Sequence, residues 1–153
     1  MGGMTDDEIY RKYSGDLVRF ATALVGPFDA PDVVVDACLR AFSTGEWRKV
    51  ANHRAYLYRA VVNQARSHHR STLRRRLREM RSAVPEEVHV TESDLDVLAA
   101  VERLSVQQRA AVILTYWDDL TQEEVAARLG ISSGSVNRHL ARARTRLREY
   151  LDA

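Results

Sequence analysis

The sequence has little of what stabilises secreted proteins, binds metals or crosses membranes. Its one cysteine cannot form a disulfide within the chain, and no set of Cys and His residues has the spacing of a zinc site. No apolar run approaches the length of a membrane span, and the acidic residues 5–10 lack the basic and apolar regions of a signal peptide. These absences predict a cytoplasmic protein with no membrane insertion, no metal and no cofactor.

Hydrophobic residues recur at helical spacing almost throughout the chain. No segment alternates convincingly with a period of two, so strands are not expected. With 153 residues and 45% hydrophobic content, the chain can bury one ordinary core or two small ones. We therefore predict an all-α fold. The expected helices cover residues 5–24, 31–43, 53–80, 95–103, 106–117, 122–129 and 133–151.

The net charge of +2 hides a strong segregation of charge along the chain. Residues 66–81 carry seven arginines and one acid, residues 85–102 carry six acids and no Lys or Arg, and residues 138–148 carry five arginines and no acid. This pattern indicates two surfaces for a polyanion with a spacer between them, although solvated arginine-rich helices are a common alternative. It predicts domains at 5–80 and 94–151, joined by a short acidic linker at 81–93.

Residues 121–151 have the local signals of a helix-turn-helix. Thr121 and Glu124 stand at the spacing of a capping box, so a helix is expected to begin at residue 122. Gly130 can take the left-handed conformation that ends a helix, and Ser132 can cap the next one. A turn this short requires the two helices to cross steeply, which is the helix-turn-helix pattern.

The second helix of this motif has one apolar stripe and one basic face. The expected buried stripe is Val136, Leu140, Ala143, Leu147 and Leu151. The opposite side carries Gly134, Arg138, Ala141, Arg142, Thr145 and Arg148, with Asn137 on its flank, and no acid occurs between residues 133 and 148. Arginine can pair with guanine edges and asparagine with adenine edges. This face favours DNA contact over the alternative of a basic helix that only packs.

The N-terminal part offers two further surfaces. Residues 53–78 combine aromatic positions with late arginines, which suits melted nucleic acid, although Tyr56 and Tyr58 each fit the commoner role of a core or interface residue. The helix before them presents Asp32, Asp36 and Arg40 on its polar face. These charges suit a protein partner or ordinary local salt bridges.

Three segments together resemble a known family. Residues 30–42 (APDVVVDACLRAF), 56–71 (YLYRAVVNQARSHHRS) and 104–151 resemble the two domains of an extracytoplasmic-function (ECF) sigma factor of the sigma-70 family, closest in wording to the actinobacterial SigE-type group. The resemblance covers about residues 8–151 in the right order. It implies a protein that binds core RNA polymerase, directs it to promoters and helps to melt them. Residues 5–80 would be region 2 and residues 94–151 region 4.

The resemblance also implies roles for particular residues. Those matching the −10 element positions are Asn63, Arg66, His69 and Arg70. Those matching the −35 element positions are Ser135, Asn137, Arg138, Ala141 and Arg142. Those matching the polymerase-docking helix are Asp32, Asp36 and Arg40. Four positions depart from the usual pattern. Val35 stands where glutamine is usual, Tyr56 stands where many members carry tryptophan, and Arg138 and His139 replace residues common in other members, which leaves the preferred −35 sequence open.

The partners implied by the resemblance are promoter DNA and core RNA polymerase, through the clamp helices of its largest subunit and the flap of the second. An anti-sigma factor is a further expected partner, since family members are often held inactive by one. The alternative is a stand-alone helix-turn-helix regulator that binds a palindrome as a dimer, and a helical adaptor for proteins is a weaker one. No nucleophile, base and metal set converges in the sequence, so an enzyme is not expected.

Overall fold

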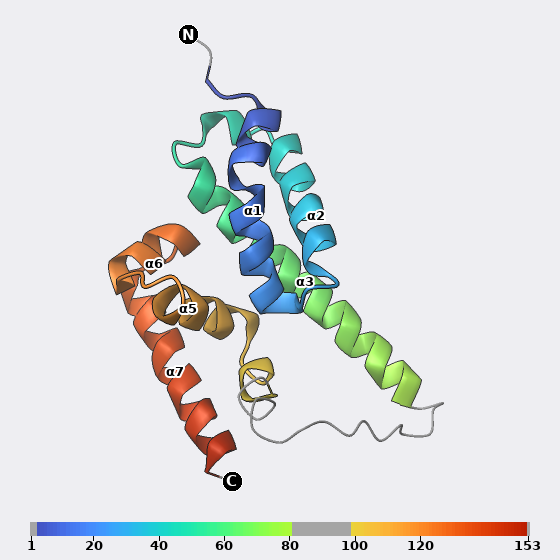
Figure 1. Cartoon of the computed structure of the whole chain (residues 1–153), viewed down its shortest axis with the longest axis vertical. Coiled ribbons are helices and arrows are strands. Elements are labelled where there is room, and N and C mark those ends of the chain that lie inside the picture. The colour runs from blue at the N-terminus through green and yellow to red at the C-terminus, as the bar shows by residue number, and fades with distance from the viewer. Residues whose placement is uncertain (1–2, 81–98, 153) are drawn as a thin grey trace.

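Helices form every regular element in residues 3–80 and 99–152, which are the residues that the computed structural model describes, and this part of the chain contains no strand. Figure 1 shows their arrangement. The elements are α1 (Asp6–Val25), α2 (Ala30–Ser43), the 3-10 helix η1 (Trp47–Lys49), α3 (His53–Met80), α5 (Val106–Tyr116), α6 (Gln122–Leu129) and α7 (Ser133–Leu151), and residues 99–102 are also helical.

The predicted all-α class is confirmed, and the bounds of these six long helices agree with the predicted ones to within one residue. Of the helix expected at 95–103, residues 99–102 are helical and residues 95–98 lie outside the described residues. The expected linker at 81–93 also lies outside them. The 3-10 helix η1 was not predicted.

Short polar side chains explain where the helices begin. The Thr5 hydroxyl accepts a hydrogen bond from the backbone N–H of Glu8, and Ser105 caps α5 in a reciprocal capping box with Gln108. At the start of α6, the Thr121 hydroxyl accepts from the N–H of Glu124, whose carboxylate accepts from the N–H of Thr121. The capping box predicted at 121–124 is therefore confirmed.

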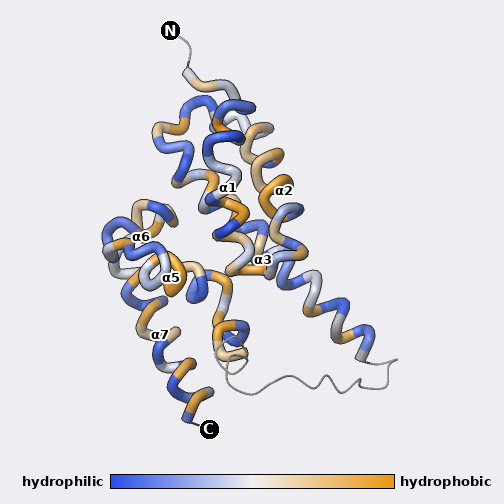
Figure 2. The backbone as a smooth tube through the Cα atoms, in the orientation of Figure 1, coloured by the Kyte–Doolittle hydropathy of each residue, from blue (hydrophilic) through white to orange (hydrophobic). Residues whose placement is uncertain are grey.

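The first three helices pack around a core that is closed to solvent. Leu17 of α1, Val34 of α2, and Leu57 and Val61 of α3 are fully buried. Figure 2 shows the contrast between the mostly apolar α2 and the hydrophilic C-terminal half of α3, which extends beyond the other helices. Cys38 is buried in the same core, and its burial raises the pKa of the thiol to about 11.

The last three helices form a second packed group. Leu114 of α5, Val125 of α6 and Val136 of α7 have no exposed surface, and Leu140 and Ala143 continue the inner face of α7. The predicted stripe is wrong at its end: Leu147 is partly buried and Leu151 is 56% exposed. The apolar periodicity of the sequence thus continues to the end of α7, but full burial of the stripe ends at Ala143.

Candidate nucleic-acid and polymerase interface

The turn between α6 and α7 has the geometry that the sequence predicts. Gly130 ends α6 with φ of 67°, in the left-handed region where a side chain is disfavoured. The Ser132 hydroxyl then accepts a hydrogen bond from the N–H of Ser135 and caps α7. A second contact closes the turn, since the Gln122 side chain donates to the carbonyl of Ser133 at 2.7 Å. The helix-turn-helix prediction is thus confirmed in its local geometry.

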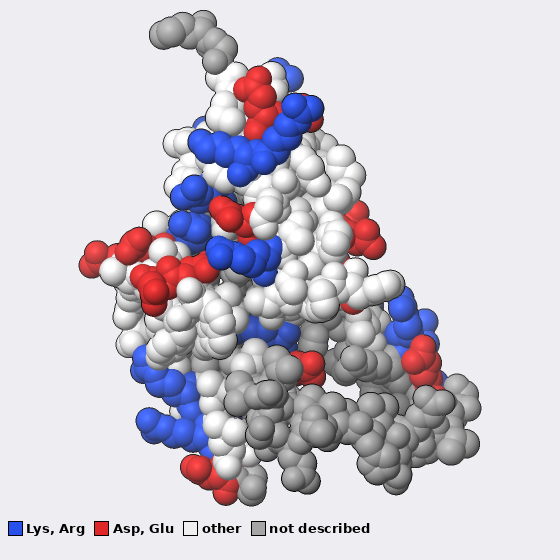
Figure 3. Space-filling model, in the orientation of Figure 1, with Lys and Arg blue, Asp and Glu red and all other residues white. Residues whose placement is uncertain are grey.

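The outer face of α7 presents the predicted −35 residues together on one surface. Asn137, Arg138, Ala141 and Arg142 are exposed, and Ser135 is half-buried. Figure 3 shows basic side chains along the part of the surface over α7, while acidic side chains gather over α6 and near the C-terminus. An exposed basic helix held at the edge of a helix-turn-helix has the form required to enter a major groove.

A short chain of hydroxyls orients one of these arginines. The Ser132 hydroxyl donates to the Ser135 hydroxyl at 3.0 Å, and the Arg138 guanidinium donates to the same Ser135 oxygen at 2.9 Å. The hydrogen bonds of the Ser132 cap therefore extend through Ser135 to Arg138 on the outer face of α7. Sequence reasoning identified Ser132 as a cap and Arg138 as a base-contacting residue, but not the link between them.

His139 lies beside the same surface in a half-buried position. Burial lowers the pKa of its imidazole, and the nearby positive charges of Arg142 and Arg138 lower it further. The neutral imidazole is favoured as a result. The positive charge of the face therefore comes from its arginines.

A groove of about 220 Å³ lies between α2 and α3, beside the predicted −10 residue Asn63. Polar groups from both helices line it, and an aromatic ring stands at one end. The lining residues are Ala37, Arg40, Ala41, Thr44, Tyr56, Ala60, Asn63, Gln64 and Ser67. Gln64 and Ser67 were not predicted; their spacing from Asn63 and Ala60 on one helix face was the available signal.

The other predicted −10 residues follow Asn63 along α3. Arg66 is half-buried, and His69 and Arg70 are exposed. They do not line the groove but continue the basic track beyond it. The structure therefore separates this set into a polar groove at Asn63 and a charged helix surface after it.

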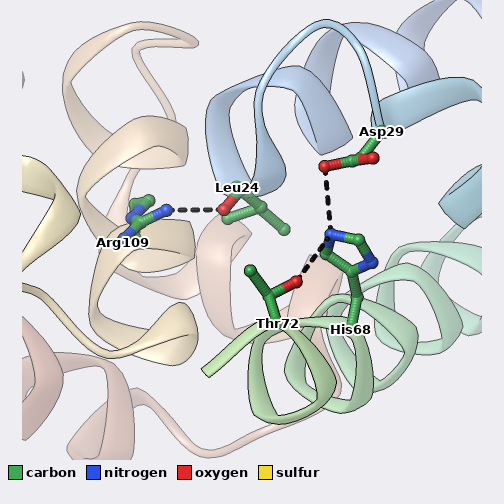
Figure 4. A network of polar contacts seen from close by, with 5 residues as sticks. All are labelled: Leu24, Asp29, His68, Thr72 and Arg109. Atoms are coloured by element: carbon green, nitrogen blue, oxygen red, sulfur yellow. Dashed lines mark hydrogen bonds and ion pairs between the residues drawn. The ribbon is translucent and has the colours of Figure 1, made fainter. Parts of the chain in front are cut away.

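His68 fixes this part of α3 against the start of α2. Its Nε2 atom lies 3.1 Å from the carboxylate of Asp29 and 3.4 Å from the hydroxyl of Thr72 (Figure 4). Asp29 is the N-cap residue of α2. The contact joins α3 to the start of α2, the two helices that line the groove.

The loop that enters α3 is held by aromatic packing. Trp47 of η1 is 2% exposed, and its ring centroid lies 4.4 Å from that of His53 and 5.4 Å from that of Tyr56. The indole N–H donates to the carboxylate of Asp6 at 2.9 Å. Tyr56 therefore packs against Trp47, which fits its predicted core or interface role, and its ring also lines the groove. Its predicted contact with melted nucleic acid stays a prediction.

The outer face of α2 mixes charge with exposed apolar surface. Asp32, Asp36 and Arg40 are exposed, as predicted, and Val35 and Leu39 between them are 41% and 62% exposed. Apolar side chains of this size on an exposed helix face are typical of a protein interface. Arg40 belongs to both surfaces, because it also lines the groove with Asn63.

Within the described residues, no three His, Cys, Asp or Glu side chains come together to hold a metal ion. The same part of the chain has no helix that is long and apolar enough to cross a membrane.

Comparisons with known proteins agree with this arrangement. Residues 9–76 match the family model for sigma-70 region 2, and residues 94–147 match the model for sigma-70 region 4. The chain is 35% identical to the RNA polymerase sigma-E factor of Streptomyces antibioticus, over 95% of this chain and 84% of that protein. It is also 35% identical to the sigma-E factor of Streptomyces coelicolor, over the whole chain and 90% of that protein.

A solved structure has a similar fold over nearly the whole chain. The sigma factor RpoE of Bartonella quintana, in complex with the anti-sigma factor NepR, superposes with a TM-score of 0.59 at 26% identity and covers 96% of each chain. Both promoter-binding regions of the family are thus present in one chain, in the expected order. The chain belongs to the ECF sigma factors of the sigma-70 family, the RNA polymerase subunits that direct promoter recognition and transcription initiation.

Proposed function

We propose that this sigma factor divides promoter recognition between a duplex-reading surface and a melted-strand surface. The −35 surface is the outer face of α7, with Ser135, Asn137, Arg138, Ala141 and Arg142. The −10 surface is the groove and basic track of α3, with Asn63, Arg66, His69 and Arg70. In this proposal residues 5–80 form region 2, residues 94–151 form region 4 and residues 81–93 link them.

The observation that carries the proposal is the exposed, acid-free basic face of α7 at the edge of a helix-turn-helix. Arg138 and Arg142 can each pair with the acceptors of a guanine, and Asn137 can pair with an adenine. The small side chain of Ala141 allows close approach to the base edges. Ser135 holds Arg138 in place and can also contact a phosphate.

The groove beside Asn63 suits an unstacked base of a melted strand. Its amide and hydroxyl groups can bond the edge of a base, and Tyr56 offers a ring for stacking. Arg66, His69 and Arg70 then follow the phosphates of the same strand along α3. The positive charge along α3 supplies affinity that does not depend on sequence, and the polar groove supplies specificity for a base.

Core RNA polymerase is the proposed partner of the outer face of α2. Asp32, Asp36 and Arg40 would pair with charges on the clamp helices of the largest subunit, while exposed Val35 and Leu39 would supply apolar contact. Region 4 would dock on the flap of the second subunit. We expect the polymerase to carry all the catalysis, so the sigma factor itself is not an enzyme and acts in the cytoplasm.

An anti-sigma factor is a proposed regulatory partner. The support is the similarity to a sigma factor solved in complex with one, the B. quintana RpoE. Such a partner would compete for the polymerase-docking and DNA-binding surfaces.

Run-off transcription tests the proposed function. Core RNA polymerase is incubated with a pool of promoter fragments, with and without the sigma factor. We expect transcripts that depend on the protein and that disappear with Asn63→Ala or Arg142→Ala, while Arg11→Ala, which removes an exposed arginine of α1, leaves them unchanged. Failure to bind core polymerase together with tight binding to a palindromic duplex would instead establish the stand-alone regulator.

A further inference from the structure

The ring of Phe28 is held out from the fold at the turn between α1 and α2. It is 91% exposed, more than any other large apolar side chain of the described residues. A single exposed apolar side chain on a flexible loop would need no explanation. The turn at Phe28 is different, because the chain restrains its backbone on both sides.

Three local features restrain this turn. Gly26 ends α1 with φ of 89°, in the region that glycine adopts most readily. The rings of Pro27 and Pro31 fix their own φ angles on either side of Phe28. The backbone N–H of Ala30 donates to the carbonyl of Gly26 at 3.2 Å, so the helical pattern of hydrogen bonds starts before α2 itself.

A tertiary contact ties the same turn to α3. The residue after Phe28 is Asp29, whose carboxylate lies 3.1 Å from Nε2 of His68 (Figure 4). An aromatic side chain on so restrained a turn loses little conformational freedom when it binds. Phe28 therefore has the properties of a preorganised anchor residue.

Phe28 also continues the exposed apolar stripe of α2. Val35 and Leu39, the exposed large apolar residues of that helix, follow it by seven and eleven residues. At about 100° per residue, both spacings return to the face of Phe28 to within about 20°. At about 1.5 Å per residue, the stripe from Phe28 to Leu39 is roughly 16 Å long.

The charges beside the stripe indicate the chemistry of its partner. Asp32 and Asp36 are exposed next to it, while Arg40, the single basic residue of α2, lines the groove with Asn63. Carboxylates repel DNA phosphates, so the stripe is not suited to promoter DNA. It fits a protein surface that has an apolar socket with basic groups at its rim. For a subunit of RNA polymerase, core polymerase is the protein partner that requires such a face.

We propose that Phe28 is the anchor residue of the contact with core polymerase, and that its ring enters an apolar socket on the largest subunit in line with Val35 and Leu39. The proposal rests on the proposed function for the identity of the docking helix, and it extends the docking surface to the turn before α2. The apolar residue at position 35, where the family usually has glutamine, makes the stripe continuous. His68 is a positioning residue, since it acts on the turn through Asp29.

The affinity for core polymerase tests the anchor. Phe28→Ala should weaken binding of the full chain at least tenfold, as truncation of a central aromatic residue does, in a titration followed by fluorescence anisotropy. The midpoint of urea denaturation should stay unchanged, because a ring that is 91% exposed contributes little to the stability of the free chain. Leu77→Ala, at an exposed apolar residue of α3, is the control and should bind as the wild type does. Wild-type affinity of Phe28→Ala would overturn the proposal.

A double-mutant cycle tests the positioning role of His68. His68→Ala should weaken core binding several-fold, because the turn loses its contact with α3. Added to Phe28→Ala, the same change should cause no further loss, since His68 acts through the ring that is already absent. Full additivity of the two losses would overturn this role of His68.

Photocrosslinking identifies what the ring contacts. With p-benzoylphenylalanine in place of Phe28, the main crosslink in the holoenzyme should be to the largest subunit, and an excess of the unlabelled chain should abolish it. A main crosslink to promoter DNA, to another polymerase subunit or to a second copy of the chain would overturn the proposal.

Failure of the proposed function would look different from failure of the anchor. If the proposed function is wrong, the wild-type chain itself does not bind core polymerase. If the wild type binds and Phe28→Ala binds equally well, the proposed function stands and only the role of Phe28 is overturned.

Discussion

Arg138 donates a hydrogen bond to the hydroxyl of Ser135, one helical turn before it, at 2.9 Å. The Ser135 hydroxyl also accepts from Ser132, whose oxygen caps α7. A side chain of the proposed −35 surface is thus connected to the hydrogen bonds that begin its helix. Arginine side chains lose much rotational freedom on binding, so an arginine that is already oriented loses less.

Removal of the Ser135 hydroxyl should weaken promoter binding with little effect on folding. Ser135→Ala leaves the helix cap intact, because Ser132 still accepts from the backbone N–H of residue 135. The lost hydrogen bond is worth about 1 kcal/mol, so we expect an affinity for the −35 element roughly fivefold lower. Fluorescence anisotropy of holoenzyme on a −35 duplex measures it, with Ser133→Ala as the matched control. An unchanged affinity would show that Arg138 does not depend on Ser135.

Ser132→Ala should act differently, through the stability of the motif. It removes the hydroxyl that accepts from the N–H of Ser135 and the donor to the Ser135 oxygen. Loss of such a cap lowers the free energy of unfolding by about 1 kcal/mol. Urea denaturation followed by circular dichroism checks this. Equal midpoints for the wild type and the variant would contradict the role of Ser132 as a cap.

Gly130→Ala should destabilise the protein by about 1 to 2 kcal/mol. The φ of 67° at Gly130 disfavours any side chain, and the added methyl group would also meet the Arg59 guanidinium. The double variant Gly130→Ala and Arg59→Ala distinguishes the two causes, measured by urea denaturation. We expect most of the loss to remain in the double variant, because backbone strain persists while the flexible arginine can move aside.

Arg109→Met should be among the more damaging single changes. Methionine fills much of the same volume but leaves the carbonyls of Leu24, Val101 and Glu102 buried without their donor. We expect a loss of about 3 kcal/mol in the free energy of unfolding. Arg19→Met, at a side chain that is 70% exposed, is the control and should change it by less than about 0.5 kcal/mol. A small effect at both positions would mean that water replaces Arg109 without penalty.

His139 should make stability depend on pH on the acidic side of neutrality. Burial, Arg142 and Arg138 lower the pKa of its imidazole in the folded state, so the unfolded chain binds the proton more readily. The free energy of unfolding should therefore be highest above about pH 6.5 and fall as the pH drops through that value toward the folded-state pKa. Urea denaturation between pH 5 and pH 8 should show a smaller fall in His139→Gln. Equal slopes for both proteins would exclude His139 as the cause.

The sequence predicts the helices well because their limits depend on local signals. Thr121 and Ser132 act within one turn of themselves, and Gly130 acts through its own backbone, so no knowledge of the rest of the fold is needed. The exposed side of α7 follows from the periodicity of its sequence. The buried stripe was wrong at Leu151 because periodicity cannot show where the packed surface of the neighbouring helices ends.

The contacts that join distant segments could not be predicted in this way. The carbonyl partner of Arg109 on α1 lies 85 residues earlier in the chain, and Gln64 becomes part of a groove only when α2 packs beside α3. The role of Tyr58 could not be predicted from the sequence either, because its position allowed a core, an interface or a nucleic-acid role. In the fold, Tyr58 is buried and its ring lies against Arg128.

The two tryptophans of the chain lie in opposite surroundings. Trp47 is 2% exposed among other rings, while Trp117 at the end of α5 is 66% exposed. A dissolved quencher such as iodide should therefore reach Trp117 and not Trp47. The unlabelled protein consequently contains two optical reporters, one for each promoter-binding region, and the Phe variant of either leaves the other to be followed alone.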